Sequence, residues 1–224
     1  MGAVADMFRD RTDAARQLAA HLEKYKGKSP LVLGVPRGGV VVAAILAREL
    51  DGDLDVILTR KLRSPGNPEL AMGSIDENGD IYLNESVVSV LRVGKETIEE
   101  ERRQQLAVIR TRAECYRRIY PKIPLESRRV IITDDGIATG ATMRVAIQSV
   151  RAARPKSVAV ALPVGPPDSV MELEGMVDEV VCLYRPFDFM AVGQFYTMFD
   201  QVEDRDVEDI LRRFAKMRVA SRFR

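Results

Sequence analysis

Short, almost entirely apolar segments alternate with helix-forming segments along much of this chain. Residues 31–35 (Leu-Val-Leu-Gly-Val) and 130–132 (Val-Ile-Ile) are typical of strands that are buried on both faces. Apolar residues at helical spacing stand between and beside them, at residues 12–25, 40–50 and 142–153. Because strand–helix–strand units of this kind form right-handed crossovers, the pattern predicts an α/β fold, in which helices flank a mainly parallel, twisted sheet.

The middle of the chain interrupts this alternation. Residues 60–84 are rich in turn-forming residues, and Asn78-Gly79 between two apolar stretches predicts a β-hairpin. A long charged helix is predicted over residues 95–120. We therefore expect residues 62–124 to form an appendage of loop, hairpin and helix beside the sheet.

The strand pattern then resumes at residues 158–162 and 180–183, and an amphipathic helix is predicted at residues 202–217. No segment between these elements is long enough to separate independent domains. We interpret residues 1–224 as one domain, in which residues 185–224 form an aromatic segment followed by the closing helix.

Composition excludes several classes of protein. Lys and Arg total 34 and Asp and Glu total 33, so the net charge of +1 provides no global field for non-specific nucleic-acid binding. No apolar run approaches the roughly 20 residues of a membrane span, and residues 1–11 lack the apolar stretch of an export signal. Two cysteines and the single His21 leave little material for a disulfide framework, a zinc site or a catalytic triad. We expect a cytoplasmic protein without membrane or nucleic-acid partners.

Residues 129–143 run from an apolar strand, through a small-residue loop, into a helix. Parallel sheets bind ligands at such strand-to-helix turns, because the first amides of the helix are free donors and its dipole favours an anion. Gly136 and Gly140 let the backbone approach a ligand closely, while Thr139 and Thr142 add hydroxyl donors. The loop therefore predicts a site for a phosphate monoester.

Two neighbouring acids, Asp134 and Asp135, open the same loop. Carboxylates beside a bound phosphate would repel it, so they must face hydroxyl donors or a cation, and both a ribose diol and hydrated Mg²⁺ qualify. A phosphate site next to diol-binding carboxylates describes a site for a ribose 5-phosphate. The alternative is an ordinary solvated turn that caps a helix.

A second glycine-rich turn, residues 34–39 (Gly-Val-Pro-Arg-Gly-Gly), also follows a buried strand and opens a helix. Its amides and Arg37 suit another anion, although a plain turn is an equal alternative, and no Gly-Lys-Ser/Thr follows as in a nucleoside-triphosphate loop. Arg60 and Lys61 follow the strand predicted at residues 54–58, which places them on the same edge of the sheet. A solvated basic turn is the alternative there.

The segment around Asp134 and Asp135 resembles the thirteen-residue signature of type I phosphoribosyltransferases, which bind 5-phosphoribosyl-1-pyrophosphate (PRPP). The resemblance covers residues 8–214 and is nearest to a bacterial and archaeal group of mostly unassigned substrate. That group has stretches similar to residues 34–39, 60–62, 67–71 and 191–193 of this chain. The resemblance implies the type I phosphoribosyltransferase fold, in which an appendage, the hood, lies over the sheet.

The resemblance also implies roles for individual residues. Contacts to the ribose and its 5-phosphate are implied for Asp134, Asp135, Gly136, Ala138, Thr139, Gly140, Ala141 and Thr142. Contacts to the pyrophosphate are implied for Pro36, Arg37, Gly38, Gly39, Arg60 and Lys61, with a cis peptide between Pro36 and Arg37. Catalysis is assigned to Arg37, Lys61, Asp134 and Asp135. The implied cofactor, Mg²⁺, is held mainly by PRPP, with the two aspartates acting through water. Residues 64–73 are the candidate for a loop that closes over PRPP, and a purely structural loop is the alternative.

The acceptor is less constrained. Ala138 stands where hypoxanthine-guanine enzymes of the family have an acidic residue, which argues against a 6-oxopurine. We expect Ile137, Phe189, Phe195 and Tyr196 to line an acceptor pocket; the alternative is that the aromatic residues pack against the closing helix.

The resulting hypothesis is an enzyme of nucleotide metabolism that transfers the phosphoribosyl group of PRPP to a small, nucleobase-like nitrogenous acceptor. The competing hypothesis is a PRPP- or nucleotide-sensing regulator that contacts RNA, suggested by the arginines of the long helix. Homodimers are common for the fold that the resemblance implies.

Overall fold

The computed structural model describes residues 8–222, and for residues 68, 69 and 218–222 it describes the backbone alone. Five parallel strands form the core sheet in the order β2-β1-β6-β7-β8. Their bounds are β1 Leu31–Gly34, β2 Asp53–Val56, β6 Arg129–Thr133, β7 Ser157–Val164 and β8 Glu179–Tyr184. The predicted α/β fold with a parallel sheet is therefore confirmed.

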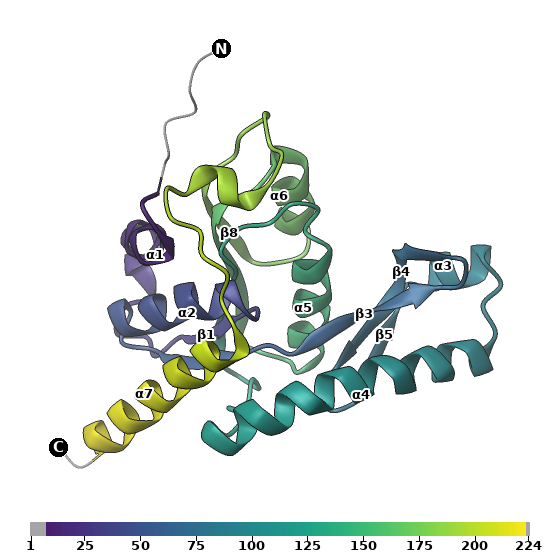
Figure 1. Cartoon of the computed structure of the whole chain (residues 1–224), viewed down its shortest axis with the longest axis horizontal. Helices are drawn as coiled ribbons and strands as arrows, with labels where there is room; N and C mark the ends of the chain where they lie inside the picture. Colours follow the sequence, from purple (N-terminus) through teal and green to yellow (C-terminus); the bar gives the residue numbers. More distant parts are fainter. Residues whose placement is uncertain (1–7, 223–224) are drawn as a thin grey trace.

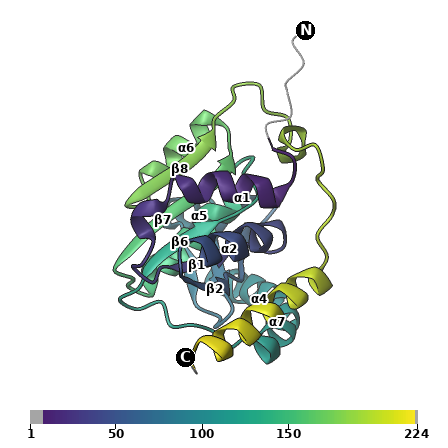
Figure 2. The ribbon, with the colours of Figure 1, turned by 90° about the vertical axis from the view of Figure 1, so that its left-hand side faces the viewer.

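Helices cover both faces of the sheet, as Figure 1 shows and Figure 2 repeats from the side. The helices α1 (Arg11–Ala20) and α2 (Gly38–Glu49) lie on one face, and α5 (Ala141–Ala152) and α6 (Pro167–Glu174) lie on the other. The closing helix α7 (Asp204–Arg222) packs against α2 and α4. The sequence pattern did not indicate α6, and α1 is shorter than expected because a separate 3-10 turn follows it.

The appendage begins at residue 59 rather than 62. Strands β3 (Thr59–Ser64), β4 (Asn67–Asp76) and β5 (Ile81–Leu83) form an antiparallel sheet, followed by helices α3 (Glu85–Val90) and α4 (Lys95–Ile119). We call residues 59–119 the hood. Figure 1 shows it extending away from the core, with α4 running back along it from its outer end. The hairpin expected at Asn78-Gly79 is present, because Gly79 adopts a φ of 89° there.

Two expectations about this region were wrong. Arg60 and Lys61 do not end a core strand: β2 stops at Val56, and both residues belong to β3 of the hood. Residues 64–73 are not a long loop either. They form a tight turn at Gly66, where φ is 73°, and then enter β4, because cross-strand pairing with β3 satisfies the backbone that a loop would leave exposed.

Arg117 of α4 joins the hood to the core. Its Nη1 lies 2.5 Å from Oδ1 of Asp55 on β2, and its Nη2 lies 2.7 Å from Oε1 of Glu77 in the β4–β5 turn. Asp55 Oδ2 also accepts a hydrogen bond of 2.8 Å from the backbone of Ile123. Each charged group in this buried cluster therefore has a partner from another element, which fixes the base of the hood.

No helix in residues 8–222 is long and apolar enough to cross a membrane. His21 is exposed at the end of α1, where its Nδ1 lies 3.1 Å from the Gln17 carbonyl, as expected for a solvated helix histidine.

Candidate functional site

The two predicted anion loops leave the sheet side by side. Gly34 at the end of β1 is paired with Thr133 at the end of β6, so the loops that follow these neighbouring strands meet at one edge. We call residues 35–38 the first loop and residues 134–140 the phosphate loop. Parallel pairing alone produces this proximity, because it places the carboxyl ends of both strands together.

The phosphate loop has the features of an anion site. Gly140 caps α5 in the left-handed conformation, with a φ of 67°, and the twelve-residue helix directs its free amides towards the loop. Ala138, Thr139 and Thr142 are exposed. The Ser169 hydroxyl donates to the Ala138 carbonyl at 2.8 Å, which ties the loop to α6. The segment therefore exposes the hydroxyl-bearing residues Thr139 and Thr142, and its backbone is tied to α6.

The first loop packs directly against the two acids. A methyl group at Gly38 would lie 1.9 Å from Asp135 Oδ2, and one at Gly39 would lie 2.8 Å from the Asp134 Cα atom. The peptide between Pro36 and Arg37 is cis. Sequence reasoning assigned the glycines to ligand approach, but in this structure they are required by the contact between the two loops.

Asp134 and Asp135 are partly buried between these loops. The backbone amide of Asp135 donates to Asp134 Oδ1 at 2.9 Å. Burial, and after it the neighbouring charge of Asp135, raise the pKa of Asp134 well above its ordinary range. A carboxylate pair in this state is stabilised by hydroxyl donors or by a cation that reaches it.

An unpredicted residue, Arg11, contacts this pair. Its Nε lies 2.7 Å from Asp135 Oδ2, and the two side chains are only 11% and 14% exposed. On the other side of the acid, the Tyr196 hydroxyl donates to the Asp135 carbonyl at 2.6 Å. Burial and the charge of Asp135 raise the pKa of Tyr196, so its hydroxyl remains a donor. No spacing rule could have found Arg11, because 124 residues separate it from Asp135.

A cavity of about 610 Å³ opens between the core and the hood. It is lined by Pro36, Thr59, Arg60, Lys61, Arg112, Thr139, Ala141, Thr142, Arg144 and Val145. Four of these residues are cationic and none is acidic. The predicted residues Pro36, Arg60, Lys61, Thr139, Ala141 and Thr142 are therefore brought together, and Arg112 and Arg144 join them unforeseen.

Other predicted residues lie outside this lining. Asp134, Asp135, Gly38 and Gly39 lie where the two loops meet. The guanidinium of Arg37 faces the start of α7, where its Nη1 lies 3.3 Å from Glu203 Oε2. The expectation that Arg37 faces pyrophosphate does not match this orientation, because the acidic start of α7 attracts it.

The predicted acceptor residues are mostly buried. Phe195 is 0% exposed, Ile137 and Tyr196 are each 5% exposed, and the ring centroids of Phe189 and Phe195 lie 5.4 Å apart. The aromatic residues form a small core cluster with Phe8 and Val164 rather than packing on α7. Neither Phe195 nor Tyr196 is among the residues that line the cavity of about 610 Å³.

The described residues contain no cluster of three or more His, Cys, Asp or Glu side chains that could hold a metal by themselves. Asp134 and Asp135 are a pair, and one oxygen of Asp135 is occupied by Arg11. This arrangement suits a divalent cation that takes most of its ligands from a bound substrate.

Known proteins are similar to this chain over most of its length. Two curated proteins from the CDC 1551 and H37Rv strains of Mycobacterium tuberculosis, each named "Putative phosphoribosyl transferase", are 46% identical to this chain over 207 residues. The match covers 92% of this chain and 47% of each relative, so the chain spans about half their length. The crystal structure of TT1426 from Thermus thermophilus is 45% identical, with a TM-score of 0.88 over 92% of this chain and 98% of that one. Residues 5–194 match the phosphoribosyl transferase domain, and the chain therefore belongs to that family.

Proposed function

We propose that this chain transfers the 5-phosphoribosyl group of PRPP to a small nitrogenous acceptor and releases pyrophosphate. The observation that carries the proposal is the cavity of about 610 Å³, in which Thr139 of the phosphate loop and the start of α5 lie beside four cationic residues and no acidic one. PRPP carries a phosphate monoester at one end and a pyrophosphate at the other, so an acid-free, cation-lined cavity beside an anion loop suits it.

The chemistry of the lining residues indicates which part of PRPP each would bind. The amides at the start of α5 and the hydroxyls of Thr139 and Thr142 would hold the 5-phosphate. Arg60, Lys61 and Arg112 would face the pyrophosphate. Transfer breaks the bond between C1 and the pyrophosphate oxygen, which takes the electron pair while positive charge develops on the ribose. A nitrogen of the acceptor then forms the new bond to C1 and releases its proton to water. Cations fixed around the leaving group stabilise that charge separation without a protein nucleophile.

The ribose hydroxyls would be bound by the carboxylates of Asp134 and Asp135. Mg²⁺, held mainly by PRPP and through water by these acids, would neutralise charge on the departing pyrophosphate. The protein itself orients the sugar and keeps its two phosphate groups apart. Burial and the charge of Asp135 raise the pKa of Asp134, and hydroxyl donors from a bound ribose would lower it again by stabilising the ionised form.

The acceptor is proposed to be nucleobase-like. The first experiment supplies the protein with PRPP, Mg²⁺ and a panel of nucleobases and small heterocyclic amines while pyrophosphate is measured. Acceptor-dependent release supports the transferase. Tight PRPP binding without release for any acceptor would instead identify a PRPP sensor, and absence of PRPP binding would overturn both.

A double variant tests the ribose site. Asp134→Asn with Asp135→Asn should weaken PRPP binding by at least about a hundredfold, because two charged hydrogen-bond acceptors are lost. A matched control changes two exposed aspartates, Asp51→Asn with Asp188→Asn, and should leave the affinity unchanged. Calorimetric titration with PRPP and Mg²⁺ measures both. Equal affinities in wild type and the first variant would remove the ribose assignment.

A further inference from the structure

Arg11 is fixed on several sides at the edge of the proposed substrate site. Besides the 2.7 Å contact of its Nε with Asp135, its Nη1 donates to the Asp200 carbonyl at 2.8 Å. Its guanidinium carbon lies 3.9 Å from the centroid of the Phe199 ring. A guanidinium that bonds a carboxylate and a carbonyl while it stacks on a ring is held in one orientation.

The backbone around Arg11 explains how it reaches this position. Asp10 caps α1 by accepting a hydrogen bond of 2.8 Å from the amide of Asp13, which sets where the helix begins. Just before it, the Phe8 amide donates to the Phe195 carbonyl at 3.1 Å and the Thr197 amide donates to the Phe8 carbonyl at 2.9 Å. The start of the described chain therefore runs beside residues 195–198. Arg11 is thereby placed between the phosphate loop and that segment.

Arg11 also touches the first loop. A methyl group at Gly38 would lie 3.1 Å from Arg11 Nε, so the guanidinium passes directly over that glycine. It occupies the Oδ2 atom of Asp135, the acid farther along the loop, while the Asp135 carbonyl is held by Tyr196. Asp135 is thus fixed through both its side chain and its backbone.

A positive charge at this point also has an electrostatic consequence. Two neighbouring carboxylates repel each other and repel a polyanionic substrate. Arg11 offsets one of these charges and leaves Asp135 able to accept a ribose hydroxyl through its remaining lone pairs. The contact is largely shielded from solvent, so it is weakly screened by salt.

We infer that Arg11 is a positioning residue for the ribose of the substrate, acting through Asp135. The inference rests on the proposed function. Because Arg11 contacts the acid and does not line the cation-rich cavity, its influence is confined to the sugar and does not extend to the pyrophosphate.

The test compares three ligands, each titrated with Mg²⁺: PRPP, ribose 5-phosphate and inorganic pyrophosphate. Arg11→Met should bind PRPP and ribose 5-phosphate about tenfold or more weakly and bind pyrophosphate as wild type does. Arg11→Lys, which keeps the charge but loses the planar fork, should recover part of the loss. Arg16→Met, an exposed arginine on the same helix, is the matched control and should change none of the three.

A double-mutant cycle shows whether Arg11 acts through the acid. If it does, Arg11→Met should add little to the loss caused by Asp135→Asn, whereas independent effects would add. Equal weakening of all three ligands, or full additivity in the cycle, would overturn the inference, because each indicates a general structural role. If Arg11→Met proves unstable, Arg11→Lys carries the same comparison of ligands. Wild-type protein that binds none of the ligands would overturn the proposed function, whereas unchanged binding in both Arg11 variants overturns the inference alone.

Discussion

Arg112 and Arg117 stand five residues apart on α4, yet they lie in opposite environments. The side chain of Arg117 is 18% exposed and its partners Asp55 and Glu77 are 2% and 9% exposed. The side chain of Arg112 is 38% exposed, contacts the half-exposed Asp204 at 3.1 Å, and lines the cavity. The difference teaches that a buried ion-pair cluster gives Arg117 a role in the fold, whereas Arg112 pairs near the surface and lines the cavity.

The largest effect is expected at Arg117. Arg117→Met leaves Asp55 and Glu77 buried without their common partner, so the free energy of unfolding should fall by about 3–5 kcal/mol. Urea denaturation measures it, with Arg118→Met, at the exposed neighbouring position, as the control. A loss below about 1 kcal/mol would show that the buried cluster does not hold the hood to the core.

Arg112 should behave in the opposite way. Because its ion pair is exposed, Arg112→Met should change the free energy of unfolding by less than about 1 kcal/mol. Its loss should nevertheless weaken binding of pyrophosphate with Mg²⁺ by about ten- to a hundredfold, since a charged hydrogen-bond donor leaves the cavity. Calorimetry and urea denaturation on the same sample separate the two outcomes. A variant that loses stability but keeps its affinity would reverse the comparison.

The pH dependence of stability tests the cluster of Arg117, Asp55 and Glu77. Burial alone would raise the pKa of Glu77, but hydrogen bonds and charge from Arg117, with the charge of Lys122, outweigh it and lower the pKa below the ordinary 4.5. A depressed pKa means that the ionised carboxylate stabilises the folded state above about pH 4.5, and that this stabilisation is lost as the pH falls through the lowered value.

Glu77→Gln should therefore be less stable than wild type at neutral pH, and the difference should shrink as the pH falls from about 5 to 3. Asp55 is present in wild type and in Glu77→Gln, and burial raises its pKa. Its titration therefore contributes to the pH dependence of stability in both proteins. Urea denaturation at a series of pH values measures the difference. A gap that stays constant across this range would contradict the lowered pKa.

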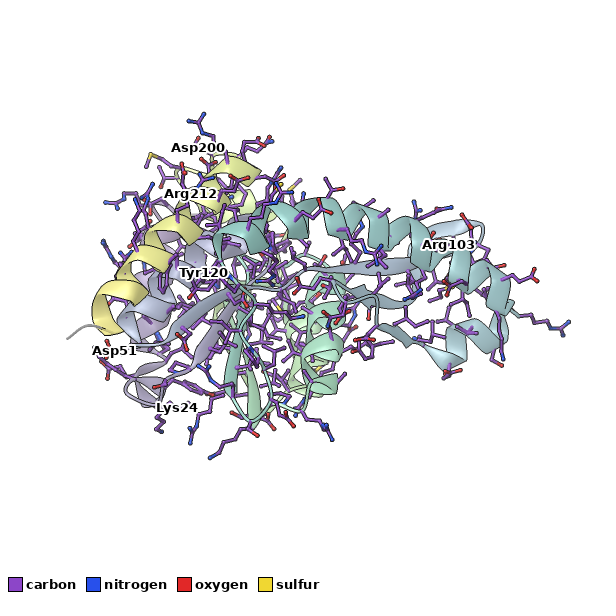
Figure 3. All side chains as sticks on the ribbon, turned by 90° about the horizontal axis from the view of Figure 1, so that it is seen from below. Lys24, Asp51, Arg103, Tyr120, Asp200 and Arg212 are labelled. Carbon is purple, nitrogen blue, oxygen red and sulfur yellow. The ribbon has the colours of Figure 1, made fainter. Side chains whose placement is uncertain are left out.

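The smallest effect is expected at the outer end of the hood, where Figure 3 shows Arg103 far from the core. A hollow of about 710 Å³ lies there, larger than the proposed site, but both acidic and basic residues line it.

Arg103 pairs with Glu100 at 2.6 Å on the exposed face of α4. Arg103→Ala should cost less than about 0.5 kcal/mol and leave PRPP affinity unchanged. Weaker PRPP binding in this variant would indicate that the PRPP site extends to the outer end of the hood.

The elements that the sequence predicted best are those that local pattern controls. The buried strands, the long helix and the Asn78-Gly79 hairpin follow from side-chain periodicity and turn chemistry, and all are present. The segment at residues 64–73 was misjudged, because Pro and Gly near its start suggested a loop and pairing with β3 made it a strand. Local turn propensity is overridden where a neighbouring strand offers hydrogen-bond partners to the backbone.

The sequence by itself determined the parallel sheet, the phosphate loop and its two acids, because each is a contiguous segment whose residues act together over a few positions. Only the tertiary structure decided which partners each charged side chain has. It buried Arg117 and Phe195, turned Arg37 towards α7, opened Arg112 to the cavity, and brought Arg11 to Asp135. The physical reason is that a charge takes its role from the partners and solvent around it, and these come from segments that are distant in the chain.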